Sequence, residues 1–89
     1  MNYVYLLRCG DDSLYCGWTN DLVARLAAHQ SGKGAKYTRA HQPVELVDYE
    51  EFETKSEAMH REAEIKRYSR AQKLALVQAN TPSAYLPRP

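Results

Sequence analysis

Two short segments rich in tyrosine, separated by a tight turn, constrain the fold of this chain most strongly. Residues 2–9 read NYVYLLRC and residues 14–18 read LYCGW, a composition of aromatic, β-branched and leucine side chains that is typical of strands. The intervening GDDS at 10–13 consists of residues that favour turns. The chain is therefore predicted to begin with an antiparallel hairpin.

The register of this hairpin brings two phenols to one face. A three-residue loop places Tyr5 opposite Gly17 and Leu7 opposite Tyr15, so that both tyrosine rings project from the same side of the sheet. A shift of one residue would separate them. Gly17 has no side chain, which allows close access to the backbone there.

A helix and a loop follow the hairpin. Thr19 or Asn20 can cap a helix that begins near Asp21 and runs to about Gln30, where glycines follow. Residues 31–43 are polar and basic and are predicted to form a loop. Together these features predict one helix between the hairpin and the next strand.

The segment VELVDYEEF at 44–52 is predicted to form a third strand. Its apolar alternation changes phase between Leu46 and Val47, which indicates a bulge. Thr54 and Glu57 then have capping-box spacing, and the same spacing returns at Ser69 and Gln72. Two further helices are predicted, ending near Tyr68 and Asn80.

The resulting order is β-β-α-β-α-α, which indicates an α+β fold with a small three-stranded antiparallel sheet flanked by helices. A chain of 89 residues is long enough for one domain, predicted at 1–80, and the proline-containing segment 81–89 is predicted to be a flexible tail. Cys9 and Cys16 are too few for a disulfide framework, and no apolar run approaches the roughly 20 residues that span a bilayer. We expect a cytoplasmic protein that does not bind membranes.

The distribution of charge is more informative than the net charge of +1. Five acidic and no basic residues lie in 45–53, whereas the lysines and arginines of 66–73 have no acid among them. One acidic and one basic face are the expected result, and a basic face is the electrostatic requirement for binding nucleic acid. Ordinary solvated faces would give the same pattern.

Two polar residues lie beside the apolar stripe of the first predicted helix. Leu22, Val23 and Leu26 mark its core side, and at 100° per residue His29 falls about 20° and Arg25 about 60° from Leu22. Both side chains should therefore lean toward the sheet. A snorkelling arginine and a satisfied boundary histidine are the structural alternative to a functional pair.

The next helix repeats this anomaly with a carboxylate. Ala58 and Ile65 define its buried line, and Glu62 lies about 40° from Ala58. Lys66 at i+4 offers only a weak pairing of about 0.3–0.5 kcal/mol, so a metal ion or an arginine of another element is the better partner for a partly buried acid. A purely structural ion pair remains the alternative.

These residue types suit the hydrolysis of a phosphodiester, which needs a metal, a base and cations. Glu62 is a hard oxygen ligand of the kind Mg²⁺ prefers, Arg25 has the planar fork that grips phosphate, and a tyrosine becomes a base once positive charge stabilises its phenolate.

The ordered set resembles the GIY-YIG endonuclease superfamily, over about residues 2–78. The first motif is Tyr3-Val4-Tyr5 and the second is Tyr15-Cys16-Gly17. The helical arginine is Arg25, and the glutamate of an alanine-x-x-x-glutamate helix is Glu62. The surrounding SGKGAKYTR and SEAMHREAEIKRYSRAQKLALV are similar to the small stand-alone bacterial branch.

The resemblance implies a domain that cuts DNA strands with one divalent metal, Mg²⁺ or Mn²⁺. Glu62 would hold the metal, Tyr15 or His29 would be the base, Arg25 would bind the scissile phosphate, and Tyr5 would support them. The histidine four residues after the arginine matches only some restriction-enzyme members.

The chain departs from the family pattern at two positions. Tyr3 replaces the glycine of the first motif, and RAQKLAL stands where several active members have an asparagine, so that Lys73 is the substitute there. Larger members also carry a separate DNA-binding domain. Target choice would therefore come from this domain itself or from a partner protein.

The loop GKGAKYT lacks the spacing of a nucleotide-binding phosphate loop. Lys33, Lys36 and Arg39, interleaved with Tyr37, instead make a DNA-contact loop, with a solvated loop as the alternative. With Gly17 and Lys73 they complete the predicted substrate-binding residues.

Three functions compete. The first is a metal-dependent endonuclease acting on DNA, as a nicking or structure-selective enzyme, with Tyr5, Tyr15, Arg25, His29 and Glu62 on one face. The second is a DNA-binding module that keeps the scaffold without turnover. The third is a protein-interaction domain that uses the acidic segment 45–53. Double-strand cutting would require two sites, and the oligomeric state stays open.

Overall fold

The structure, a computed structural model, describes residues 1–80, and the predicted tail at 81–89 lies outside the described residues. Strands β1 (Asn2–Arg8) and β2 (Leu14–Thr19) form the predicted hairpin, and β3 (Glu45–Phe52) pairs with the other side of β1. All pairings are antiparallel in the order β2-β1-β3, so β2 is an edge strand. The α+β class and the predicted order of elements are confirmed.

The predicted register and bulge are both present. Tyr5 pairs with Gly17 and Leu7 with Tyr15, as the three-residue loop requires. Between β1 and β3 the pairing passes from Asp48 to Leu46 on consecutive β1 residues, which leaves one extra residue in β3 at the predicted position. Both features follow from local sequence, because turn length and apolar phase determine which residues face each other.

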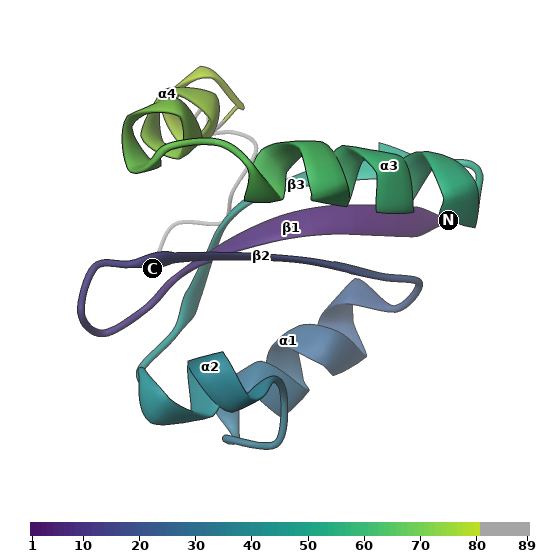
Figure 1. Ribbon diagram of the computed structural model, residues 1–89. Helices are drawn as coiled ribbons and strands as arrows, with labels where there is room; N and C mark the ends of the chain where they lie inside the picture. Colours follow the sequence, from purple (N-terminus) through teal and green to yellow (C-terminus); the bar gives the residue numbers. More distant parts are fainter. Residues whose placement is uncertain (81–89) are drawn as a thin grey trace.

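Helices cover both faces of the sheet (Figure 1). Helices α3 (Lys55–Lys66) and α4 (Arg70–Asn80) lie on one side, and α1 (Leu22–Gln30) and α2 (Lys36–Ala40) lie on the other. The side chains of β1 alternate between these layers. Val4 and Leu6 belong to the cluster containing Ala58 and Ile65, whereas Tyr5 and Leu7 belong to a cluster against which α1 packs.

Helix α3 begins with the predicted capping box, in which the Thr54 hydroxyl accepts from the Glu57 backbone N–H at 3.1 Å and the Glu57 side chain reaches back to Thr54. The same reciprocal bonds join Ser69 and Gln72 before α4. The first of these helices ends at Lys66, two residues earlier than predicted. None of the helices in residues 1–80 is both long enough and apolar enough to cross a membrane.

Two predictions about α1 were wrong. Its N-cap is Asp21, whose carboxylate accepts from the Ala24 backbone N–H at 3.1 Å, and Thr19 instead accepts from the Asp21 N–H. Val23, expected on the core side, is 81% exposed. His29 is fully buried, so the buried side of α1 is centred on Leu22 and His29. Val23 therefore faces solvent.

The segment 31–43 is not a plain loop, since it contains α2. No side chain caps this five-residue helix. Its contacts are tertiary: Thr38 is completely buried against His29, and Tyr37 stacks on the ring of Tyr15. Helix propensity alone did not indicate it, because short helices depend on packing rather than on local sequence.

Candidate active site

The side chain of Tyr5, on β1, extends over the edge strand β2 at Gly17. A β-carbon placed on Gly17 would lie 2.5 Å from the Tyr5 Oη and 2.7 Å from its Cζ. The glycine therefore gives room to the phenol of the neighbouring strand. The close approach expected at Gly17 is made by Tyr5, and a direct contact with substrate stays a prediction.

The Tyr5 hydroxyl is bonded into the protein interior. Its oxygen lies 2.8 Å from His29 Nε2, and His29 Nδ1 lies 2.7 Å from the Thr38 Oγ1. His29 has no exposed surface, so the histidine leans toward the sheet as predicted. Both of its ring nitrogens are occupied, and it has no surface that could meet a water or a substrate directly.

Burial and charge set the protonation of this pair. Burial raises the pKa of Tyr5, although a hydrogen-bonding interaction with the Arg25 guanidinium opposes the rise. Burial also lowers the pKa of His29, and the nearby charge of Arg25 lowers it further. Both groups are therefore neutral near pH 7. Arg25 is half-buried beside them, so Tyr5, Arg25 and His29 form one cluster on the α1 side.

We expect acid to destabilise the folded protein through His29. The unfolded chain takes up a proton as the pH falls below about 6.5, whereas folded His29, with its lowered pKa, does so only at lower pH. The free energy of unfolding should therefore decrease as the pH falls through this window. Urea titrations at about pH 7.5 and about pH 5.5 measure the slope, which His29→Gln should flatten. An unchanged slope in the variant would contradict this assignment.

Tyr15 is the more accessible of the two phenols. It is half-buried, its ring lies 5.4 Å from that of His29, and it stacks on Tyr37 at 5.9 Å. Tyr37 stacks in turn on His41 at 4.1 Å and donates a hydrogen bond to the Ser13 hydroxyl at 2.6 Å. These contacts attach α2 to the hairpin and hold Tyr15 in place.

Glu62 does not share the face of the tyrosines, which corrects the prediction of a single face. It lies on α3, in the layer on the other side of the sheet, where its charge contributes to raising the pKa of the Cys16 thiol to about 12, after burial. Cys16 stands between Tyr15 and Gly17 on β2. Cys16 packs with Ala58 and Ile65 of α3, so the helix that carries Glu62 covers this stretch of the edge strand from the opposite layer, because neighbouring strand residues point to opposite faces.

The negative charge of Glu62 is only weakly balanced by a positive charge nearby. The Glu62 side chain is 19% exposed, and its Oε2 lies 3.5 Å from the Lys66 Nζ. Within residues 1–80 no arginine forms an ion pair with it, so one of the two expected partners is missing. An exposed lysine at i+4 contributes little, which leaves the carboxylate suited to a metal ion.

The donor set fits a weakly held hard cation. In the described part of the chain, no group of three or more histidine, cysteine, aspartate or glutamate side chains could enclose a metal. Mg²⁺ keeps several waters and is commonly bound through one or two carboxylates together with substrate phosphates. Glu62 can supply that one carboxylate. The fit is therefore to a cation completed by water and DNA.

The predicted substrate-binding cations lie on both sides of β2. Lys33, Lys36 and Arg39 are exposed in and before α2. Lys73 lies on α4, where it lines a hollow of about 160 Å³ together with Leu14 of β2, and its charge also acts on Cys16. Lys73 and Glu62 therefore approach the edge strand in the same layer.

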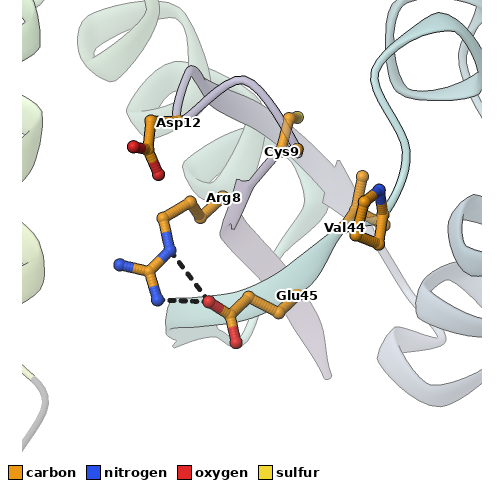
Figure 2. A pocket seen from close by; sticks show the side chains of 7 residues that line it. Arg8, Cys9, Asp12, Val44 and Glu45 are labelled. Carbon is orange, nitrogen blue, oxygen red and sulfur yellow. Dashed lines mark hydrogen bonds and ion pairs between the residues drawn. The ribbon is translucent and has the colours of Figure 1, made fainter.

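A second hollow, of about 420 Å³, is lined by other residues. Figure 2 shows it at the end of the hairpin, where Arg8 forms an ion pair and hydrogen bond with Glu45. Cys9 and Val44 line it as well, and none of the predicted site residues does. We assign it no part in the candidate site.

Sequence reasoning missed three residues that surround His29. Thr38 bonds to its ring, Gly34 packs so tightly that a β-carbon would lie 2.4 Å from Nδ1, and the Gln42 amide donates to the carbonyls of His29 and Thr38 at 2.7 Å each. The available signal was the motif GKGAKYT, whose lysines alone were given a role in the sequence prediction. Its glycine and threonine spacing indicates a tight packing turn.

The comparison with known proteins defines the class. Residues 1–75 match the family of the GIY-YIG catalytic domain. The chain therefore belongs to the GIY-YIG family, whose domains are nuclease-like and whose nucleases generally depend on divalent metals.

Within the family the chain is similar to small UPF0213 proteins. One from Clostridium perfringens is 56% identical over 81 residues, covering 91% of this chain and 87% of the relative. One from Natronomonas pharaonis is 54% identical over 80 residues, covering 90% and 94% respectively. The solution NMR structure of the UPF0213 protein from Bacillus halodurans matches with 46% identity and a TM-score of 0.62, over 96% of this chain and 92% of that one.

Proposed function

We propose that this protein is a divalent-metal-dependent endonuclease that hydrolyses phosphodiester bonds of DNA, with nicking or structure-selective activity. One observation carries the proposal: polar side chains approach residues 15–17 of an edge strand from both layers. On the α1 side Tyr5 extends to Gly17, and the charge of Arg25 acts on Tyr5; on the other side α3, which carries Glu62, packs against Cys16. The outer side of β2 pairs with no other described strand, so a DNA backbone can lie along it between these groups.

Each residue has a role in this proposal. Arg25 grips the scissile phosphate with its planar fork and neutralises the charge that develops on it. Tyr15 is the base, because it is accessible whereas His29 is enclosed. Tyr5 and His29 hold Arg25 and the neighbouring phenol in position. Lys33, Lys36, Arg39 and Lys73 bind phosphates that flank the scissile bond.

Glu62 would hold the metal, Mg²⁺ or Mn²⁺, through its carboxylate. When bound, such an ion polarises the phosphate and lowers the pKa of a coordinated water. The i+4 lysine would be released from Glu62 as the ion enters, since a lysine and a cation compete for the same oxygens. A single site cuts one strand, which favours nicking, and target choice rests with the domain or with a partner protein.

A DNA-binding module without turnover is the second candidate. It is favoured by Lys73, which stands in place of the asparagine of several active family members. In that case the scaffold and the arginine would bind phosphate while Glu62 would be dispensable. The acidic segment 45–53 supports a protein-interaction function less well, because Asp48 is buried and two of its glutamates, Glu45 and Glu50, form ion pairs with arginines.

Cleavage assays test the proposal directly. Purified protein is incubated with duplex, nicked, branched and single-stranded DNA in Mg²⁺, Mn²⁺ or EDTA, and cleavage is expected only with metal. Arg25→Ala should weaken DNA binding, and should make the dependence of log affinity on log salt shallower by about 0.9 if one phosphate contact is lost.

Arg8→Ala is the matched control. Arg8 is paired with Glu45 at the end of the hairpin, so removing its guanidinium should leave binding and cleavage unchanged. Metal-independent cleavage, or an Arg25→Ala variant that binds and cuts like the parent protein, would refute the assignment of the site. Tight binding with no cleavage of any of the four DNA forms would establish the second candidate.

A further inference from the structure

We propose that Thr38, on α2, is a positioning residue that fixes the proton of His29 on Nδ1 and thereby makes the Tyr5 hydroxyl a donor to His29 Nε2. The motif GKGAKYT, which lacks the spacing of a phosphate loop, thus has a different role. It holds the histidine in one tautomer.

The Ala35 carbonyl determines which group donates in each hydrogen bond that links Thr38, His29 and Tyr5. The Ala35 carbonyl has no proton, so Thr38, at 3.0 Å from it, must be the donor. The hydroxyl has one proton, and toward His29 Nδ1 at 2.7 Å Thr38 can then only accept. Nδ1 therefore carries the hydrogen.

A neutral imidazole has one N–H, so Nε2 of His29 is an acceptor and the Tyr5 hydroxyl, 2.8 Å away, donates to it. The lowered pKa of His29 agrees with the neutral form. At the other end the positive charge of the Arg25 guanidinium acts on Tyr5, and a guanidinium has only donors. The Ala35 carbonyl thus gives the three bonds from Tyr5 through His29 and Thr38 one direction, and bonds aligned in this way polarise one another.

The segment before α2 fixes the position of the His29 ring by packing against it. A β-carbon on Gly34 would lie 2.4 Å from Nδ1 and 2.8 Å from Cγ of His29, so the backbone packs directly on the imidazole. The Gln42 amide also donates to the carbonyls of both His29 and Thr38, which ties α2 to the end of α1. Ring position and tautomer are thus set by one segment.

The consequence for catalysis rests on the proposed nuclease function, whereas the tautomer does not. With its hydrogen donated to His29, the Tyr5 oxygen leaves its lone pairs available to the Arg25 guanidinium, whose charge acts on Tyr5. His29 then holds Tyr5 rather than accepting a proton from the attacking water. Loss of the hydrogen bond between Thr38 and His29 should lower turnover without removing any group that is proposed to contact DNA.

Long-range proton–nitrogen correlation spectra of the isotope-labelled protein, recorded at neutral pH without DNA or metal, test the tautomer. We expect Nε2 of His29 to give a pyridine-type signal and Nδ1 a pyrrole-type signal. Thr38→Val removes the acceptor, so the two signatures should exchange or average, and Thr38→Ser should keep the original pattern. A proton on Nε2 in the unsubstituted protein would overturn the proposal, whether or not the valine variant folds.

A kinetic test adds the catalytic consequence. Thr38→Val should lower kcat for DNA cleavage about ten-fold and change KM by less than about two-fold, and serine should restore kcat. Unchanged kcat in a valine variant whose tautomer has changed would contradict the catalytic part. If the unsubstituted protein shows the expected tautomer and never cleaves DNA, the nuclease proposal fails, whereas the role of Thr38 in fixing the tautomer is confirmed.

Discussion

Replacing Glu62 with glutamine is expected to lower metal-dependent DNA cleavage by about 100-fold or more. The substitution keeps the shape of the side chain and removes the charge that would hold the cation, and that cation supplies several kcal/mol of transition-state stabilisation. Glu62 is suited to this role because its only ion pair within residues 1–80 is with an exposed lysine at 3.5 Å. Single-turnover cleavage rates with saturating protein measure the effect.

DNA affinity should respond in the opposite sense. Without metal, removing a negative charge from a phosphate-facing surface should leave the affinity unchanged or slightly tighter. Glu51→Gln is the matched control, since it makes the same chemical change at an exposed position of β3, the far edge of the sheet. Cleavage that survives Glu62→Gln would refute the metal assignment, and a loss in Glu51→Gln of equal size would show that overall charge is responsible.

Replacing Gly17 with alanine is expected to destabilise the fold by about 2–4 kcal/mol, combining overpacking with the loss of a buried hydrogen bond. The new β-carbon would lie 2.5 Å from the Tyr5 Oη, and this phenol is only 2% exposed and bonded to His29. It cannot move aside without breaking that bond. Thermal unfolding should show a fall in Tm of roughly 10 °C or more.

Two further variants isolate the cause. Gly32→Ala should cost only about 1–2 kcal/mol, because its φ of 80° strains any residue with a β-carbon but the nearest contact, Arg39 Cγ, is 3.9 Å away. In a Tyr5→Leu background the cost of Gly17→Ala should fall by more than half. An undiminished cost in that background would show that the glycine is required for some reason other than the crossing phenol.

Chain-local features could be predicted from the sequence because their causes lie within a few residues. The Gly10–Ser13 turn sets the hairpin register, the phase change after Leu46 marks the bulge, and Thr54 with Glu57 satisfies the first turn of α3. Each depends on backbone geometry and on hydrogen bonds over short separations. The order of elements followed from these local signals.

The candidate site was predictable as a set of residues and not as an arrangement. Periodicity showed that His29 and Glu62 lie toward the interior, but it reports only a direction relative to the helix axis. It does not tell which helix packs on which face of the sheet. The carboxylate consequently lies in the layer opposite the phenols.

The amino-acid sequence by itself determined the strands, the turn, the caps and the family motifs, because these arise from interactions between near neighbours in the chain. Tertiary structure alone decided that His29 is enclosed, that Tyr15 is the more accessible phenol, and that Thr38 bonds to His29. Those properties depend on which side chains become neighbours when the helices pack on the two faces of the sheet. Tyr5 and His29, which are 24 residues apart in the chain, acquire their hydrogen bond only then.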